Sequence, residues 1–173
     1  MSLSNAGRAA SEAAHAPKLT TKQFIWLIGS LCRAHGVPFD AVRLVQRFPA
    51  PHLREGLLEA VRAHGLRGEV LTPRGDDLDE LPLPAIAFLR PDMTHSLPAV
   101  RPEPIPGLIA KCEAGRLLHV EACTDLPRTR FTRNFEEFFE PGVIVALPVA
   151  RAAALAADAQ PERPAKGGEI EKG

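Results

Sequence analysis

Hydrophobic residues recur with a helical period in the first third of the chain. The residues that share the spacing i, i+3, i+4, i+7 and i+8 are Phe24, Leu27, Ile28, Leu31 and Cys32. This spacing places them on one face of a helix. Gly36 followed by Pro38 is a stop signal, because glycine favours a left-handed cap and proline cannot continue a helix. The pattern predicts an amphipathic helix from about residue 23 to residue 36.

Two further helices are predicted immediately after the first. Asp40 can cap the second helix, because its carboxylate accepts hydrogen bonds from the first free backbone N–H groups. Pro51 opens the third helix at a position where its missing N–H has no cost, and Gly65 closes that helix as a left-handed cap.

The hydrophobic pattern changes to that of strands after residue 68. The predicted strands are Glu69–Leu71, Pro84–Leu89, Gly107–Cys112, Arg116–Ala122 and Gly142–Leu147. A short helix is predicted from Thr132. The five prolines between residues 90 and 106 predict an irregular loop, and Glu113-Ala114-Gly115 predicts a short hairpin. Helices first and an antiparallel sheet afterwards indicate the α+β class.

Composition and charge narrow the range of functions. The 173 residues include 21 basic and 21 acidic residues, so no strong positive field favours nucleic acid as a partner. No apolar run reaches the roughly 18 residues that a membrane-spanning helix needs. Three cysteines without a secretory signal predict reduced thiols and a cytoplasmic location. We expect a disordered N-terminal arm over residues 1–18, one domain over 19–149 and a flexible tail over 150–173.

The stretch from Gln23 to Val37 resembles the first helix of the bacteriocin-processing cysteine peptidases. Three later segments are also similar to that family, in the same order: Leu57–Leu66, Leu81–Ile86 and Phe131–Leu147. The resemblance covers residues 20 to 148. It implies a small papain-like cysteine peptidase fold with N-terminal helices packed on an antiparallel sheet.

The resemblance also implies where catalytic residues would stand. The family's nucleophilic cysteine lies twelve residues before the His-Gly pair, and counting back from His35 reaches Gln23. The position of the catalytic histidine corresponds to Gly107, and Glu121 is the nearest match to the aspartate. The oxyanion-stabilising glutamine corresponds to Pro17. An amide cannot become a thiolate, so the resemblance implies a domain that has lost its catalytic residues.

Degenerate domains of this kind stand on haemolysin-type ABC exporters and bind unfolded secretion substrates. The resemblance therefore implies substrate binding in the former cleft, by Gln23, Trp26, Gly107, Leu108 and Glu121. The implied partners are an unfolded secreted protein, including glycine- and aspartate-rich repeat proteins, and the exporter's membrane and nucleotide-binding domains. The implied location is the cytoplasmic face of the inner membrane. No phosphate-binding loop is present, so we expect a free-standing relative or the N-terminal piece of an exporter.

Two alternatives remain open from the sequence. A working cysteine hydrolase would use Cys112 or Cys123 as its nucleophile. A structural or regulatory module would instead dock on another protein of the exporter.

Other candidate residues favour structural interpretations. Cys32 lies on the apolar face of its helix, so we expect it to be buried and unreactive. A zinc site could be assembled from Cys32, His35, His119 and Cys123, with Cys112 nearby, but these residues lack the usual ligand spacing. We therefore expect no metal and no cofactor. His119 and Cys123 are expected on one strand.

The large aromatic residues and the helical arginines have simple structural explanations. We expect Trp26 and the group Phe131, Phe135, Phe138 and Phe139 to belong to the core. The arginines on the polar helix faces, which suit an acidic client or simply solubility, are Arg43, Arg47, Arg54, Arg62 and Arg67.

Overall fold

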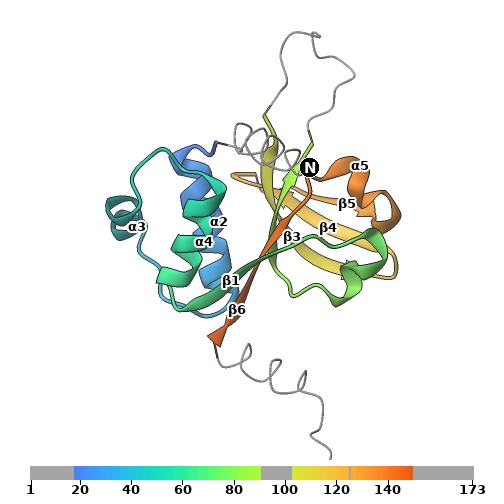
Figure 1. Ribbon diagram of the computed structural model, residues 1–173, viewed down its shortest axis with the longest axis horizontal. Coiled ribbons are helices and arrows are strands. Elements are labelled where there is room, and N and C mark those ends of the chain that lie inside the picture. The colour runs from blue at the N-terminus through green and yellow to red at the C-terminus, as the bar shows by residue number, and fades with distance from the viewer. Residues whose placement is uncertain (1–17, 91–102, 125, 150–173) are drawn as a thin grey trace, which may run out of the picture.

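The computed structural model describes residues 18–90, 103–124 and 126–149. The predicted tail over 150–173, the predicted arm up to residue 17 and most of the proline-rich loop lie outside these residues. Within them, three helices come first and a six-stranded sheet follows, with short helices between the strands (Figure 1).

The three predicted helices are present and lie together on one side of the molecule (Figure 1). They are α2 (Thr21–Ala34), α3 (Ala41–Arg47) and α4 (Arg54–Ala63). Asp40 caps α3 as predicted, because its Oδ1 accepts from the backbone N–H groups of Val42 and Arg43 at 2.9 and 3.1 Å. Gly65 has a φ of 77° after α4 and confirms the predicted left-handed cap.

The predicted start of the third helix is wrong by three residues. Pro51 lies before α4, whose N-cap is Leu53. The preceding residues are extended enough for Leu19 N–H to donate to His52 O at 2.9 Å, and this bridge holds the segment in place beside the start of α2.

The sheet has the order β1-β6-β2-β3-β4-β5, and every neighbouring pair is antiparallel. The strands are β1 (Leu66–Leu71), β2 (Ala85–Leu89), β3 (Ile105–Glu113), β4 (Arg116–Glu121), β5 (Pro127–Phe131) and β6 (Val143–Pro148). The α+β prediction is confirmed.

Two strands differ from the prediction. β1 begins at Leu66, three residues earlier than expected, because the chain leaves the cap at Gly65 directly into the sheet. β5 was not predicted, since it is almost entirely exposed and has no buried alternation to identify it. It forms because its backbone pairs with β4 at the edge of the sheet.

Two hydrophobic cores lie on opposite faces of the sheet. On β2, the side chains of Ile86 and Phe88 join the core beneath the helices, and those of Ala85, Ala87 and Leu89 join the other core. This is the alternation that a strand buried on both faces requires. The helix-side core includes much of α2 and α4, and we call the other the second core.

Short helices contribute to the second core. The 3-10 helix η1 (Gly75–Glu80) buries Leu78 there, and α5 (Phe135–Phe138), which follows the single 3-10 turn η3 (Thr132–Asn134), buries Phe135. The predicted helix from Thr132 is confirmed as this short pair. Phe131 is 52% exposed, so its predicted place in the core is wrong.

The predicted hairpin between β3 and β4 is confirmed. Glu113 pairs with Arg116, which leaves Ala114 and Gly115 as a two-residue loop with φ values of 50° and 70°. Such a loop needs positive φ at both positions to match the twist of the strands. No helix among the described residues is long and apolar enough to cross a bilayer.

Candidate functional site

Reciprocal hydrogen bonds between Thr20 and Gln23 cap the start of α2. The backbone N–H of Gln23 donates to Thr20 Oγ1 at 3.2 Å, and Gln23 Oε1 accepts from the Thr20 backbone N–H at 2.9 Å and from its hydroxyl at 3.1 Å. This is a capping box, which satisfies backbone donors that the first turn of a helix leaves free. Gln23 therefore has a structural role at the position where the resemblance implies a nucleophile.

His52 lies against the same helix start, and the sequence did not indicate it. Its ring stacks on Phe24 with centroids 4.2 Å apart, and its Nε2 lies 3.2 Å from Thr21 Oγ1. His52 is only 3% exposed, and this burial lowers its pKa. No local signal could identify the contact, because its partners lie about thirty residues earlier in the chain.

Gly107 lies in the middle of the sheet, where the backbone around it leaves no room for a side chain. A Cβ at this position would lie 2.7 Å from Val120 O and 3.3 Å from Leu89 Cδ1. Gly107 pairs with Ala87 on β2 and with Glu121 on β4. Close backbone approach is a usual reason for glycine within a strand, and it explains Gly107 without reference to a lost histidine.

The predicted binding residues divide between the two faces of the sheet. Cross-strand partners share a face, and Ala87, the partner of Gly107, belongs to the second core. Leu108 and Ala122 belong instead to the helix-side core with Phe24. Gly107 and Glu121 therefore face away from α2, whereas Leu108 faces it.

Glu121 lies in a charged environment on the face of the sheet that points away from α2. Its carboxylate pairs with Arg128 across the strands, with Oε1 3.4 Å from Nη1. Trp26 is half-buried and packs against the helix-side core, which agrees with its default assignment. Of the five predicted binding residues, Gln23, Trp26 and Leu108 lie on the helix side, and Gly107 and Glu121 do not.

His119 is a buried titratable residue next to the second core. The ring is fully buried and meets Phe139 edge-on with centroids 5.6 Å apart. Burial, together with the positive charge of Arg130, lowers the pKa of His119 to about 4. Within the described part of the chain, neither ring nitrogen has a hydrogen-bond partner, and Nε of Arg130 also has none.

Two of the three thiols, those of Cys32 and Cys112, lie in environments that favour the protonated form. Cys32 is buried as predicted, and burial raises its pKa. Cys112 Sγ donates to Asp79 Oδ1 at 3.2 Å, and burial together with this hydrogen bond raises the pKa of Cys112 to about 11. Neither of these thiols is activated as a nucleophile.

Cys123 is not on the same strand as His119, so that expectation is wrong. β4 ends at Glu121, and Cys123 lies in the following turn with a φ of 66°. Across the three described ranges, no group of three or more His, Cys, Asp and Glu side chains is placed to hold a metal ion.

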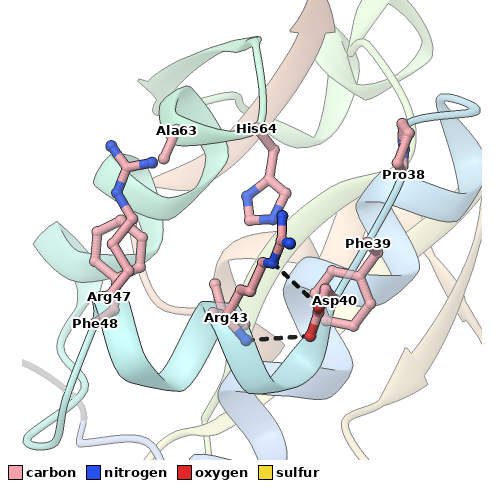
Figure 2. A pocket seen from close by; sticks show the side chains of 9 residues that line it. Pro38, Phe39, Asp40, Arg43, Arg47, Phe48, Ala63 and His64 are labelled. Carbon is pink, nitrogen blue, oxygen red and sulfur yellow. Dashed lines mark hydrogen bonds and ion pairs between the residues drawn. The ribbon is translucent and has the colours of Figure 1, made fainter.

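The arginines of the helical layer have different roles. The expectation that Arg54 lies on a solvated polar helix face is wrong. Its Nη2 donates to Pro141 O and Gly142 O, each at 3.2 Å, and its guanidinium lies 5.0 Å from the centroid of the Phe88 ring. Arg43 and Arg47 instead line a hollow between α3 and α4 (Figure 2).

The fold is that of the peptidase domains of ABC transporters. The peptidase domain of Streptococcus ComA, a bi-functional ABC transporter, superimposes with a TM-score of 0.54 at 13% identity, over 77% of this chain and 96% of that one. A double glycine motif protease from an AMS/PCAT transporter, solved in complex with the leader peptide, gives 0.56 at 10% identity, over 76% and 87%.

A third structure gives the same result. The N-terminal peptidase C39 like domain of the toxin secretion ATP-binding protein from Vibrio parahaemolyticus gives a TM-score of 0.53 at 12% identity, over 75% of this chain and 98% of that one. No protein-family model matches the sequence. No curated protein resembles it significantly in sequence. The chain thus has the peptidase C39-like fold that the resemblance predicted.

Proposed function

We propose that this chain is a non-catalytic peptidase-like domain that binds an unfolded secretion substrate for an ABC exporter. The proposal also places it at the cytoplasmic face of the inner membrane, next to the exporter's membrane and nucleotide-binding domains. The shared fold supports it, because each of the three similar structures is a domain of a transporter or secretion protein.

The observation that carries the proposal is the chemistry at the start of α2. The residue at the expected nucleophile position is an amide, and its Oε1 accepts two hydrogen bonds from Thr20. Leu108 on β3 and Ala122, just after β4, belong to the helix-side core with α2, and both are apolar and buried. A surface without a thiolate can bind an extended chain through side-chain and main-chain contacts, but it cannot attack a carbonyl.

The environments of the two candidate thiols, Cys112 and Cys123, argue against the hydrolase alternative. Cys112 keeps its proton at neutral pH, because burial and Asp79 raise its pKa to about 11. Cys123 lies in a turn and packs against the helix-side core. The docking-module alternative differs from the proposal only in its partner, so binding experiments must distinguish the two.

A binding titration tests the proposal directly. The probe is a permanently unfolded polypeptide, reduced and carboxymethylated α-lactalbumin, added to the isotope-labelled chain. We expect amide shifts at Thr20–Leu27 and Leu108. We also expect a change in the fluorescence of Trp26, which is the one tryptophan in the sequence. Trp26→Phe should weaken binding a few-fold, and the matched control Phe131→Leu on β5 should not.

A cleavage assay completes the test. A double-glycine leader peptide incubated with the chain should remain intact by mass spectrometry over a day at pH 7. Cleavage that is lost in Cys112→Ser or Cys123→Ser would establish the hydrolase instead. Shifts absent at both α2 and β3 would favour the docking module.

A further inference from the structure

A hollow lies between α3 and α4 (Figure 2), and none of its lining residues belongs to the start of α2. Its volume is about 300 Å³, at the lower end of the range of roughly 300–1,000 Å³ for small-molecule pockets. Its lining residues are Pro38, Phe39, Asp40, Arg43, Leu44, Arg47, Phe48, Ala63 and His64. The size suits one or two side chains of an extended peptide.

The walls of the hollow are aromatic and fixed by the core. Phe39 packs so tightly on α2 that a Cβ at Gly29 would lie 2.9 Å from its ring. Phe48 packs against Phe24, with ring centroids 6.3 Å apart. His64 donates from Nδ1 to Ala60 O at 2.8 Å, since a carbonyl only accepts, and Figure 2 shows its ring pointing into the hollow.

The charges at the rim are positive in excess. Arg43 and Arg47 extend over the opening from one helix, α3. The carboxylate of Asp40 pairs with Arg43 at 3.5 Å, and its Oδ1 is already used to cap α3. The guanidinium of Arg47 lies 5.6 Å from the centroid of the Phe48 ring. Among the described residues, no carboxylate is paired with Arg47, which leaves one positive charge beside an aromatic wall.

The helical part of the chain also carries an excess of basic residues. Residues 18–65, which contain the three helices, have seven Lys and Arg against three Asp and Glu. The described residues after 65 have eight Lys and Arg against eleven Asp and Glu. A neutral chain thus presents a positive helical layer, which attracts anionic partners over about a Debye length.

We infer that this hollow binds a carboxylate side chain of an extended acidic peptide, with the neighbouring apolar or aromatic side chain against Phe39 and Phe48. Arginine pairs with carboxylates through charge-assisted hydrogen bonds, and the aromatic rings supply apolar contact area. A concave site with aromatic walls suits a peptide better than a flat lipid surface. The inference concerns a different surface from the proposed function.

The test compares two peptides and two double variants. The blocked peptide Gly-Asp-Phe-Asp-Gly is titrated into the full chain and followed by amide NMR, with Gly-Asn-Phe-Asn-Gly as the uncharged analogue. We expect shifts at Val42–Arg47 and at Ala63 and His64, and about tenfold weaker binding of the amide analogue. Arg43→Gln with Arg47→Gln should weaken the acidic peptide about tenfold. The control, Arg33→Gln with Arg133→Gln, removes the same charge elsewhere and should change Kd less than twofold.

Several outcomes would overturn the inference. Equal binding of the two peptides, or equal loss in both double variants, would mean that no specific carboxylate site exists. Shifts confined to α2 and β3 would place the peptide at the start of α2, which would overturn this inference and leave the proposed function intact. Stronger binding to phosphatidylglycerol vesicles than to the peptide, with the same loss in Arg43→Gln and Arg47→Gln, would assign the surface to a membrane.

Discussion

At the scale of single residues, Cys112 shows how an immediate neighbour sets chemical reactivity. Its thiol is half-buried and donates to the carboxylate of Asp79. Both burial and a nearby negative charge disfavour the thiolate, and the thiolate is the reactive species. The same residue type is therefore an unreactive side chain here, although the sequence offers it as a nucleophile.

Alkylation kinetics should report this directly. The rate of iodoacetamide labelling at Cys112 should rise with pH throughout pH 7–10, because its pKa is about 11. Asp79→Asn removes the negative charge and should raise the rate at pH 8 by about threefold to tenfold. Labelling is located by peptide mass spectrometry, with Cys112→Ser as the blank. A rate that is already at its plateau below pH 7 would contradict the interpretation.

His119 should make the fold sensitive to acid. Its pKa is about 4 in the folded chain and about 6.5 when unfolded, so between these values the unfolded chain binds more protons. Stability should therefore be full above pH 7, fall as the pH drops through 6.5, and be reduced by on the order of 2 kcal/mol at pH 4.5. Burial also lowers the pKa of His52, which acts in the same direction.

Urea denaturation at pH 7 and pH 4.5 measures this loss. His119→Leu should reduce the difference in unfolding free energy between the two pH values, because it removes the titrating imidazole. The charges that face it, Arg128, Arg130 and Glu121, are unchanged in this variant. His52→Leu serves as the comparison for the smaller contribution on the helix side. An unchanged pH dependence in His119→Leu would exclude His119 as the titrating group.

At the scale of elements, the ends and pairings of the strands and helices depend on contacts of different range. Caps are local, so Asp40 and Gly65 were identified from the sequence. The start of α4 was not, because the segment around Pro51 is held by a backbone bridge between Leu19 and His52. β5 was also missed, because its pairing with β4 rather than an apolar pattern defines it.

Gly107 and Gly56 provide an element-scale test with a matched control. Gly107→Ala should lower stability by about 1–3 kcal/mol, because its Cβ would meet Val120 O at 2.7 Å within the sheet. Gly56 lies in α4, and a Cβ there would have no neighbour within 4 Å, so Gly56→Ala should be neutral or stabilise by up to about 1 kcal/mol. Thermal and urea unfolding measure both. Equal effects of the two substitutions would show that the close approach at Gly107 is not limiting.

At the scale of the whole molecule, one sheet joins two cores. β2 and β6 contribute side chains to both faces, so neither core can lose its packing without disturbing the same strands. We therefore expect the described domain to unfold as one cooperative unit.

Two leucine truncations on opposite faces test this cooperativity. Leu27→Ala in the helix-side core and Leu117→Ala in the second core should each cost about 2–5 kcal/mol. In both variants, Trp26 fluorescence and far-UV circular dichroism should report the same urea midpoint. A Leu117→Ala variant in which the Trp26 transition stays at the wild-type midpoint while the dichroism shifts would indicate two independent units.

The sequence by itself determined the helices, most strands and the α+β class, because periodicity and caps are local properties of the chain. The order of its segments also predicted the peptidase C39-like fold that the solved structures share. Only the tertiary structure decided which face each residue occupies. Gly107 and Glu121 lie on the face of the sheet that points away from α2. His52 packs against the start of α2, and Arg43 and Arg47 line a hollow. Strand register and the packing of distant segments set these positions, and a one-residue shift in register reverses a face.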